Sequence, residues 1–155
     1  MHMLGEPRSM QDEPRYDDVV ADVHRFLAER VFAAEMAGID RKRIVVDPGF
    51  GFGKTREHNL QLLARLDALA DLGVPLLAGL SRKRTIGELT GRDVPAERVH
   101  GSVAAHLLAA MRGARILRVH DVAPTVDALK VWSAVDAQPR PRPRAAPAMR
   151  WPDED

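Results

Sequence analysis

Apolar residues follow two different spacings along this chain, and the change of spacing predicts strands alternating with helices. Short apolar or β-branched runs are typical of buried strands, whereas apolar residues three or four positions apart are typical of amphipathic helices. Short apolar runs occur at 1–4, 43–46, 74–80 and 115–119. The stretches with helical spacing that follow them are 17–37, 55–72, 102–112 with a short piece before it at 86–89, and 124–137.

The predicted helices carry end signals. Asp17 and Thr55 are placed as N-caps, because their side-chain oxygens can accept hydrogen bonds from free backbone N–H groups. Gly38 and Gly73 are natural helix ends, since the residue after a helix often needs positive φ. Pro124 suits a first helical turn. The apolar faces expected to be buried are Val20, Val23, Leu27, Val31 and Ala34; Leu60, Leu62, Leu63, Leu66, Leu69 and Leu72; Ala104, Leu107, Leu108 and Met111; and Val126, Leu129, Val131 and Val135.

Four strand–helix repeats with short connections predict an α/β fold with parallel strands and right-handed crossovers. From Gln138 the composition changes, because five of the eleven prolines lie in this last stretch and alternate with arginine at its start. We therefore expect a folded domain at residues 1–137. We expect a disordered Pro/Arg-rich tail at 138–155.

Composition narrows the classes of function. A length of 155 residues suits one domain, and a formal charge of +1 argues against broad binding to nucleic acid or to an anionic membrane. The chain has no cysteine, which excludes disulfides, thiolate catalysis and Cys-ligated metals. No apolar run approaches the ~20 residues of a membrane span, and no signal-peptide region is visible. A cytoplasmic protein is the expectation.

The basic residues are unevenly divided, with 19 arginines and four lysines. Two of the lysines, Lys54 and Lys83, stand in loops that follow predicted strands. Arginine and lysine are not interchangeable, so the choice of lysine suggests that a compact ammonium is needed at these places. The alternative is chance, since base composition alone can enrich arginine.

Polar residues gather directly after three predicted strands, at 47–54, 81–83 and 120–121. In barrels of alternating strands and helices, and in open α/β sheets, ligands bind beyond the carboxyl ends of the strands. We therefore expect these clusters to contribute to one site.

The loop Asp47-Pro48-Gly49-Phe50-Gly51-Phe52-Gly53-Lys54 has alternating glycines, which permit positive φ and close approach to a ligand. A P-loop is excluded because Pro48 stands where its first glycine is required, and the spacing also fails the dinucleotide fingerprint. Asp47 can accept two parallel hydrogen bonds from the planar edge of a pterin or guanine. Phe50 or Phe52 can flank an aromatic ligand. The alternative is that Asp47 caps a turn and both rings are core.

The other two clusters are cationic. Ser81, Arg82 and Lys83 offer a hydroxyl group and two cations to an anion or a ring carbonyl, although a solvated basic run is the alternative. Arg118 and His120 are two positions apart on a strand, so they face the same way and suit a phosphate or diphosphate. Metal-ligand spacing is not recognisable among the other histidines, of which His24, His58 and His106 are expected on solvated helix faces.

Together these residues resemble dihydropteroate synthase. The matching pieces, in family order over about residues 1–135, are Met1-His2-Met3-Leu4-Gly5 with Met10-Gln11, the loop at 47–54, Asn59-Leu60, residues 79–83, Arg98 with Gly101-Ser102, and residues 118–121. The family is a TIM (β/α)₈ barrel that joins 6-hydroxymethyl-7,8-dihydropterin diphosphate to p-aminobenzoate, giving 7,8-dihydropteroate and diphosphate in folate biosynthesis. The resemblance implies half of that barrel, namely four βα units corresponding to strands 5–8.

The resemblance also implies roles for individual residues. The implied pterin-binding residues are Asp47 and Lys83; the shared pterin and p-aminobenzoate pocket is Gly51, Phe52, Ser81 and Arg82; the diphosphate site is Arg118, Val119 and His120. No covalent nucleophile is implied, because positioning and stabilisation of the leaving group supply the acceleration. The family's Mg²⁺ is implied as a cofactor, but its asparagine ligand belongs to the half that this chain lacks. We therefore expect no metal ligand here.

A half-barrel has two open strand edges and an uncovered apolar interior, so we expect a homodimer or other self-association. The chain is expected to be truncated, which makes activity of the isolated chain doubtful. Two alternatives stay open. One is a non-catalytic half-barrel or paralogue that acts as an interaction or structural protein. The other is a pterin-binding methyltransferase domain, in which we would not expect Ser81-Arg82-Lys83 followed by Arg118-Val119-His120.

Overall fold

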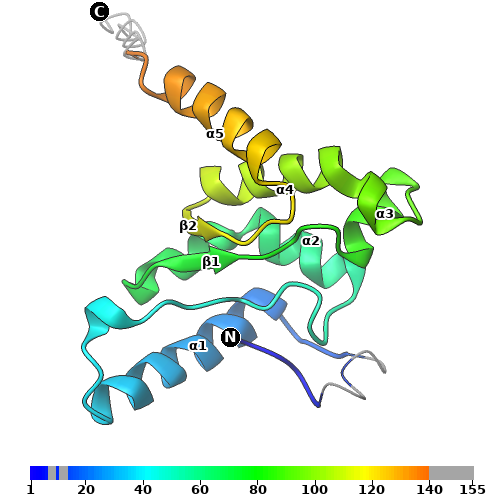
Figure 1. Ribbon diagram of the computed structural model, residues 1–155. Helices are drawn as coiled ribbons and strands as arrows, with labels where there is room; N and C mark the ends of the chain where they lie inside the picture. Colours follow the sequence, from blue (N-terminus) through cyan, green and yellow to red (C-terminus); the bar gives the residue numbers. More distant parts are fainter. Residues whose placement is uncertain (7–9, 11–13, 140–155) are drawn as a thin grey trace, which may run out of the picture.

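Helices and short parallel strands alternate along the chain in the computed structural model, which describes residues 1–6, 10 and 14–139 (Figure 1). The helices are α1 (Val19–Met36), α2 (Arg56–Ala64), α3 (Arg84–Thr90), α4 (Val99–Met111) and α5 (Val122–Asp136); the strands are β1 (Leu76–Ala78) and β2 (Ala114–Leu117). Three 3₁₀ helices lie at Arg41–Arg43, Leu66–Leu72 and Pro95–Arg98. The predicted tail lies outside the described residues, apart from its first two positions.

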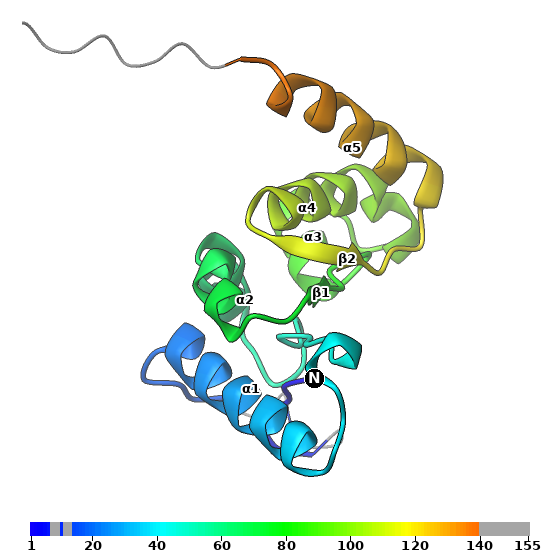
Figure 2. The same cartoon turned by 90° about the vertical axis from the view of Figure 1, so that its left-hand side faces the viewer.

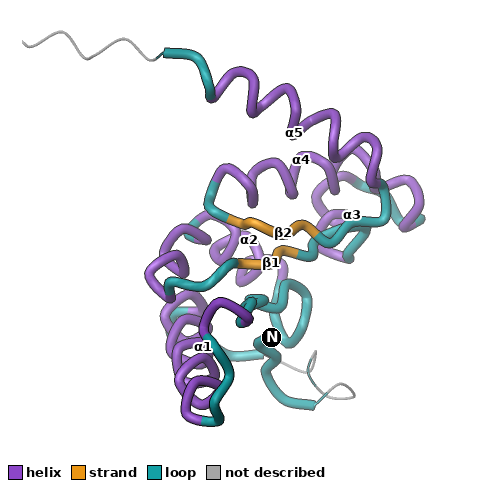
Figure 3. Tube along the Cα trace, turned by 60° about the vertical axis from the view of Figure 1, so that its left-hand side comes forward, coloured by secondary structure: helices purple, strands orange, loops and turns teal. Residues whose placement is uncertain are grey.

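The centre of the molecule is a short parallel sheet (Figure 3). Strand β1 pairs with β2, and Leu76 at the start of β1 also makes a parallel bridge to Val46. The N–H of His2 donates to the carbonyl oxygen of Asp47 at 3.0 Å, which places the first residues beside this segment. The predicted α/β class with parallel strands is therefore confirmed.

The strand predicted at 43–46 needs correction. A 3₁₀ turn occupies Arg41–Arg43, and Val46 contributes a single bridge rather than a ladder. Asp40 explains the turn, because its side chain accepts a hydrogen bond from the N–H of Lys42 and so caps it. Apolar and β-branched residues at 44–46 satisfied the strand pattern, but the local cap shortened the strand.

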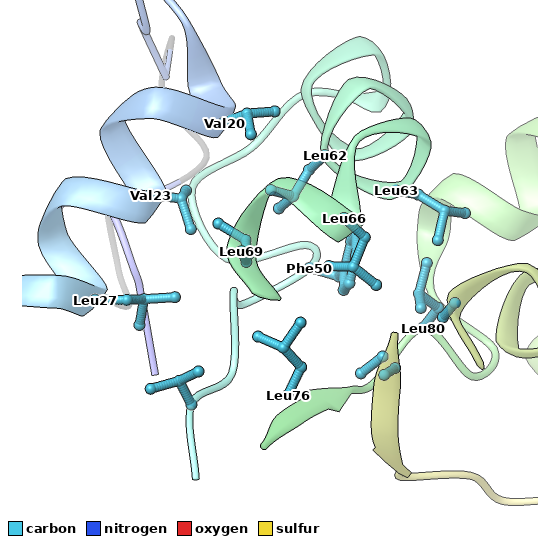
Figure 4. Close-up of a cluster of buried hydrophobic side chains, with 14 of the residues drawn as sticks. Val20, Val23, Leu27, Phe50, Leu62, Leu63, Leu66, Leu69, Leu76 and Leu80 are labelled. Atoms are coloured by element: carbon cyan, nitrogen blue, oxygen red, sulfur yellow. The ribbon is translucent and has the colours of Figure 1, made fainter. Parts of the chain in front are cut away.

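The main core lies between α1, the α2 region and β1 (Figure 4). Eight of its side chains are each at most 2% exposed, namely Val20, Val23, Leu27, Phe50, Leu62, Leu66, Leu69 and Leu76. Burying each large apolar side chain is worth about 1.5–3 kcal/mol, so this cluster supplies much of the stability of the first half of the chain. The glycine loop is anchored in the cluster through the ring of Phe50.

The helix ends agree with the sequence to within a residue in most cases. Asp18, not Asp17, caps α1, since its carboxylate accepts from Val20 N–H at 2.9 Å. Thr55 caps α2 in a reciprocal box with His58, as its position predicts. The single helix expected to Leu72 is two, because the chain tightens into a 3₁₀ helix after α2 and ends at a left-handed Gly73.

The buried face of α4 is not the predicted one. Leu108 and Met111 are 41% and 55% exposed, and the residues turned inward are Ser102, Ala105, His106 and Ala109. This helix is apolar almost all round, so spacing alone fits two faces. Small residues let it approach the sheet closely, and the two polar residues find hydrogen-bond partners inside. His106, expected on a solvated face, is completely buried.

The last helix, α5, extends away from the rest of the molecule (Figures 1 and 2). Thr125 is its buried residue, whereas Val131 and Val135 are each 67% exposed. The apolar face predicted at 126–135 is therefore largely uncovered by the described residues. Leu60 of α2, also predicted to be buried, is 37% exposed.

Candidate functional site

The glycine loop at 47–54 is held by a side chain of its own, one from α2 and one from the segment before α1. Asp47 Oδ1 accepts from Gly49 N–H at 2.7 Å, closing a turn. Asn59 in α2 accepts from Gly51 N–H at 2.7 Å, and the Tyr16 hydroxyl donates to Gly53 O at 2.7 Å. These hydrogen bonds hold the backbone of the loop in place, and Gly51 and Phe52 still border a cavity. Sequence analysis assigned no role to Asn59. The available signal was that Asn59-Leu60 is one of the pieces that match the family.

The three loop glycines all have positive φ, but they serve two purposes. A Cβ at Gly49 would lie 1.8 Å from His2 O, and one at Gly53 would lie 2.6 Å from Leu4 O. These two glycines are needed because the first residues of the chain pack against the loop backbone. Gly51 differs, since its Cβ position meets the Lys83 side chain at 3.2 Å. Gly51 thus gives room to the Lys83 side chain, and the close approach of a ligand to the glycines stays a prediction.

A cavity of about 370 Å³ lies beside Gly51. It is lined by Gly51, Phe52, Lys54, Asn59, Lys83, Arg84 and Thr85. Phe50 is 1% exposed and belongs to the core, whereas Phe52 faces the cavity with the Lys83 ammonium 4.4 Å from its ring centre. Cavities of this size suit small ligands, and the ring and ammonium suit an aromatic, electron-rich one.

Lys54 is buried under the loop, with 1% of its surface exposed. Its Nζ lies 2.9 Å from His2 Nδ1 and donates to Gly49 O at 2.9 Å and Phe52 O at 3.1 Å. Burial lowers the pKa of Lys54 to about 7, with Asp47 acting in the opposite direction. Burial, and then Lys54, lowers the pKa of His2 to about 4, so the neutral imidazole accepts from the ammonium.

The loop after β1 meets both the glycine loop and the end of β2. Lys83 donates to Phe50 O, and its pKa is lowered to about 8 by burial and then by Arg118, while Asp47 raises it. Ser81 Oγ accepts from His120 N–H at 3.1 Å and lies 2.9 Å from His120 Nδ1. Arg118 packs on Gly79, where a Cβ would lie 2.7 Å from its guanidinium. Predicted site residues of three loops are thus brought together.

Arg82 has an unusual backbone for a residue with a side chain, with φ of +57°. Its N–H donates to Ser102 Oγ at 2.9 Å, and its carbonyl accepts from Arg98 at 2.9 Å. Its guanidinium forms a two-bond pair with Asp121 at 2.6 and 3.1 Å, and this bonding lowers the pKa of Asp121. Left-handed backbone costs about 1–2 kcal/mol and persists where neighbours impose it, often at functional sites.

His106 of α4 supports the end of β1. Its Nδ1 lies 2.7 Å from Ser102 O and its Nε2 accepts from Leu80 N–H at 3.2 Å, so Nδ1 carries the proton. Burial lowers the pKa of His106, which favours this neutral form. No sequence pattern indicates this role, because Leu80 is reached only through the packing of α4 on the sheet.

Two of the remaining predictions concern Val119 and metal binding. Val119 is half-buried and lines a groove of about 680 Å³ between β2 and α5, together with Arg118. Within residues 1–6, 10 and 14–139, no group of three or more His, Asp or Glu could hold a metal ion. None of the helices in the described ranges has the length and apolar character needed to cross a membrane.

Comparison with known proteins gives consistent matches. Residues 1–120 match the family described as pterin binding enzyme. The dihydropteroate synthase of Neisseria meningitidis serogroup B is 56% identical over 138 residues, covering 87% of this chain and 48% of that protein. That of Escherichia coli K12 is 50% identical over 134 residues, covering 86% and 47%. The chain thus spans about half the length of the curated relatives it matches.

Solved structures agree. Dihydropteroate synthase from Stenotrophomonas maltophilia, with active site-bound imidazole, superimposes with a TM-score of 0.87 at 67% identity over 90% of this chain and 52% of that one. The enzyme from Xanthomonas albilineans in complex with 7,8-dihydropteroate gives 0.81 at 73% identity over 81% and 49%. The resemblance inferred from the sequence is confirmed. The chain belongs to the pterin-binding enzyme family, and the relatives it matches here are dihydropteroate synthases.

Proposed function

We propose that this chain carries half of a dihydropteroate synthase active site and forms 7,8-dihydropteroate and diphosphate when the other half of the barrel is present. The observation that carries the proposal is the convergence of the residues after three neighbouring parallel segments. Lys83 contacts the glycine loop at Phe50, and Ser81 contacts His120. The loop after β1 therefore links the glycine loop, which begins with Asp47, to the segment after β2.

The pterin is assigned to the surface between Asp47 at the start of the glycine loop and the cavity lined by Gly51, Phe52 and Lys83. Asp47 would accept two parallel hydrogen bonds from the pterin N–H and NH₂ groups, a geometry that suits a carboxylate. Lys83 would donate to a ring carbonyl or nitrogen, and its lowered pKa reflects the dry position that makes such a bond strong. Phe52 would stack on or flank the ring.

The p-aminobenzoate is assigned to the neighbouring wall at Ser81 and Arg82, with Gly51 and Phe52 shared. A relative from Xanthomonas albilineans that is 70% identical has been solved with 4-aminobenzoic acid. Arg82 is the cation available for its carboxylate, and the strained backbone and the Asp121 pair hold Arg82 in place. The aromatic amine would then point towards the pterin.

The diphosphate is assigned to Arg118 and His120, with the backbone of Val119 between them. In the reaction, the bond between the pterin methylene carbon and the diphosphate oxygen breaks, and its electron pair leaves with the diphosphate. The amine nitrogen of p-aminobenzoate forms the new bond to that carbon and then loses a proton. No protein nucleophile is needed, since cations at the leaving group and correct placement of the amine lower the barrier.

We propose that the groove between β2 and α5 receives the other half of the barrel. Leu117, Val126, Leu129 and Trp132 contribute to its walls. In the described sheet β2 is an outer strand, so a further parallel strand can pair with it. A Mg²⁺ ion, if used, would be held by that other half. Self-association through the same groove is the competing arrangement.

The test is reconstitution from two chains. The chain is mixed with labelled p-aminobenzoate and the pterin diphosphate, alone and with the separately produced first half of the Stenotrophomonas maltophilia enzyme. We expect dihydropteroate and diphosphate from the two halves together. If the halves co-elute in size-exclusion chromatography and bind pterin without turnover, the non-catalytic alternative is favoured and the proposed activity is wrong.

Substitution of Lys83 gives the sharper residue-level test. Lys83→Ala should weaken pterin binding by about 10- to 100-fold, because a hydrogen bond to a charged group is worth about 1.5–3 kcal/mol. Isothermal titration with 6-hydroxymethylpterin measures the change. Lys42→Ala, at an exposed lysine of the 3₁₀ turn Arg41–Arg43, is the matched control and should bind as the unsubstituted chain does. Unchanged affinity in Lys83→Ala would remove its assigned role.

A further inference from the structure

Lys54 is an unusual lysine. It is 1% exposed, yet in the described part of the chain no carboxylate lies within ion-pair distance of its ammonium. Burying an unpaired charge is costly, and lysine is among the residues least often fully buried. Three acceptors replace a carboxylate here, namely the imidazole of His2 and the carbonyls of Gly49 and Phe52. The three donors of the ammonium match them one to one.

The two carbonyls belong to the residues on either side of Phe50 and Gly51, and of the pair only Phe52 lines the cavity. Gly49 O and Phe52 O are also the ends of one tight turn, because Phe52 N–H donates to Gly49 O at 3.1 Å. The ammonium of Lys54 therefore bridges the two ends of this turn by donating a hydrogen bond to each carbonyl. Lys83 reaches the intervening carbonyl of Phe50 from the cavity side. Two lysines thus bind three carbonyls of one loop.

The same ammonium joins the loop to the first residues of the chain. His2 accepts from Lys54 through Nδ1 and donates through its backbone N–H to Asp47 O at 3.0 Å. A path of direct contacts therefore leads from Lys54 to the backbone of Asp47 and to that of Phe52. These are the residues assigned to the edge and the face of the pterin.

We propose that Lys54 is a positioning residue that presets the glycine loop for the pterin by binding two loop carbonyls and His2. The effect of Lys54 on pterin binding rests on the proposed function, whereas its effect on the conformation of the loop does not. The three donors of a compact ammonium match the three acceptors, whereas a guanidinium carries five donors in a rigid planar fork.

The first test follows the loop itself. Lys54→Met keeps the apolar stem and removes the donors. Below pH 7, where Lys54 is protonated, we expect amide hydrogen exchange at Gly51 and Phe52 to quicken at least tenfold. The amide of Leu77, which donates to Val46 O, is the internal reference and should not change. Equal exchange at the loop in Lys54→Met and in the unsubstituted chain would overturn the proposal.

The second test restores the ammonium chemically, and it remains informative if Lys54→Met folds poorly. The chain has no cysteine, so Lys54→Cys introduces a unique thiol. Alkylation in denaturant with 2-bromoethylamine, followed by refolding, rebuilds a side chain of lysine length that ends in an ammonium. Alkylation with bromopropane gives an uncharged side chain of the same length. Protection of Gly51 and Phe52 should return only with the ammonium, and equal protection in both products would overturn the proposal.

Binding measurements separate this inference from the proposed function. With the first half of the barrel supplied, Lys54→Met should bind 6-hydroxymethylpterin about tenfold more weakly than the unsubstituted chain, and the aminoethylated Lys54→Cys should recover most of that affinity. If the unsubstituted chain binds no pterin, the proposed function is wrong, and so is the effect of Lys54 on pterin binding. The hydrogen-exchange tests then still decide whether Lys54 orders the loop. If the unsubstituted chain and Lys54→Met bind pterin equally, the positioning role is wrong.

Discussion

The glycine loop and the segment after β2 both supply residues of the proposed site, yet the structure supports them very differently. Around the loop, Lys54, Phe50 and Asn59 are each at most 2% exposed, and the main core lies directly beneath. After β2, Arg118 and His120 are exposed, and α5 is covered so little that Val122 and Val131 are 61% and 67% exposed.

The difference indicates which part of the site this chain can organise by itself. The proposed pterin side is held by buried side chains and hydrogen bonds, so we expect its geometry to be preset. The proposed diphosphate side depends on contacts through Ser81 and Asp121 and on the part of the protein that covers the groove beside α5. We expect the first side to be orderly in the isolated chain, and the second to become so when the other half is bound.

The largest expected effect tests the difference in packing. Leu69→Ala should lower the free energy of unfolding by about 2–5 kcal/mol, because Leu69 is completely buried between α1 and the sheet and its truncation leaves a cavity. Val131→Ala, on the uncovered face of α5, should change it by less than about 0.5 kcal/mol. Urea denaturation of both variants provides the measurement. Similar losses for the two would mean that α5 is packed as tightly as the core.

The next effect is a pH dependence arising beneath the glycine loop. Between pH 6.5 and the folded pKa of His2 of about 4, the unfolded chain binds a proton that the folded chain excludes. Stability is therefore unaffected by this group above pH 6.5 and is lost as the pH falls through 4, by on the order of 3 kcal/mol in all. Lys54 and the N-terminal amine lower this pKa after burial, and Asp22 opposes them.

His2→Asn is the control for this pH dependence, because an amide oxygen can still accept from Lys54 but does not titrate. Unfolding is measured by urea at several pH values for both chains, and the difference between the two profiles isolates His2 from the carboxylates. Parallel profiles between pH 6.5 and 4 would contradict the buried, neutral His2.

The smallest expected effect concerns the second region. Asp121→Asn removes the charge that pairs with the Arg82 guanidinium, while keeping an oxygen that can accept one hydrogen bond. Because this pair is partly open to solvent, stability should change little, and p-aminobenzoate affinity should fall by a few-fold in the reconstituted protein. Titration calorimetry checks it. A loss as large as that expected for Lys83→Ala would show that the second region is as firmly preset as the first.

Local sequence patterns predicted the elements well where the determining contacts are also local. Thr55 and Gly73 mark helix ends because a hydroxyl or a missing Cβ acts within a few residues. The positions of the proposed site residues after the strands also followed from the pattern, together with the family resemblance. The roles of these residues in binding pterin, p-aminobenzoate and diphosphate remain proposals.

Other features could not be read from the sequence because their partners lie far away along the chain. The packing of separate elements creates three such hydrogen bonds. They join Asn59 to Gly51, His106 to Leu80, and Asp121 to Arg82. The choice between the two apolar faces of α4 has the same origin. Spacing shows that a face exists, whereas only the neighbouring elements show which one is covered.

The sequence by itself determined the alternation of strands and helices, the family, and a glycine-rich loop that follows a short parallel segment. Tertiary structure decided how that loop is used. It packed Gly49 and Gly53 against the first residues, left Gly51 beside the cavity, and buried Lys54 against His2. The physical reason is that positive φ is a local property of glycine, whereas burial of a charge depends on three acceptors brought together from two distant segments.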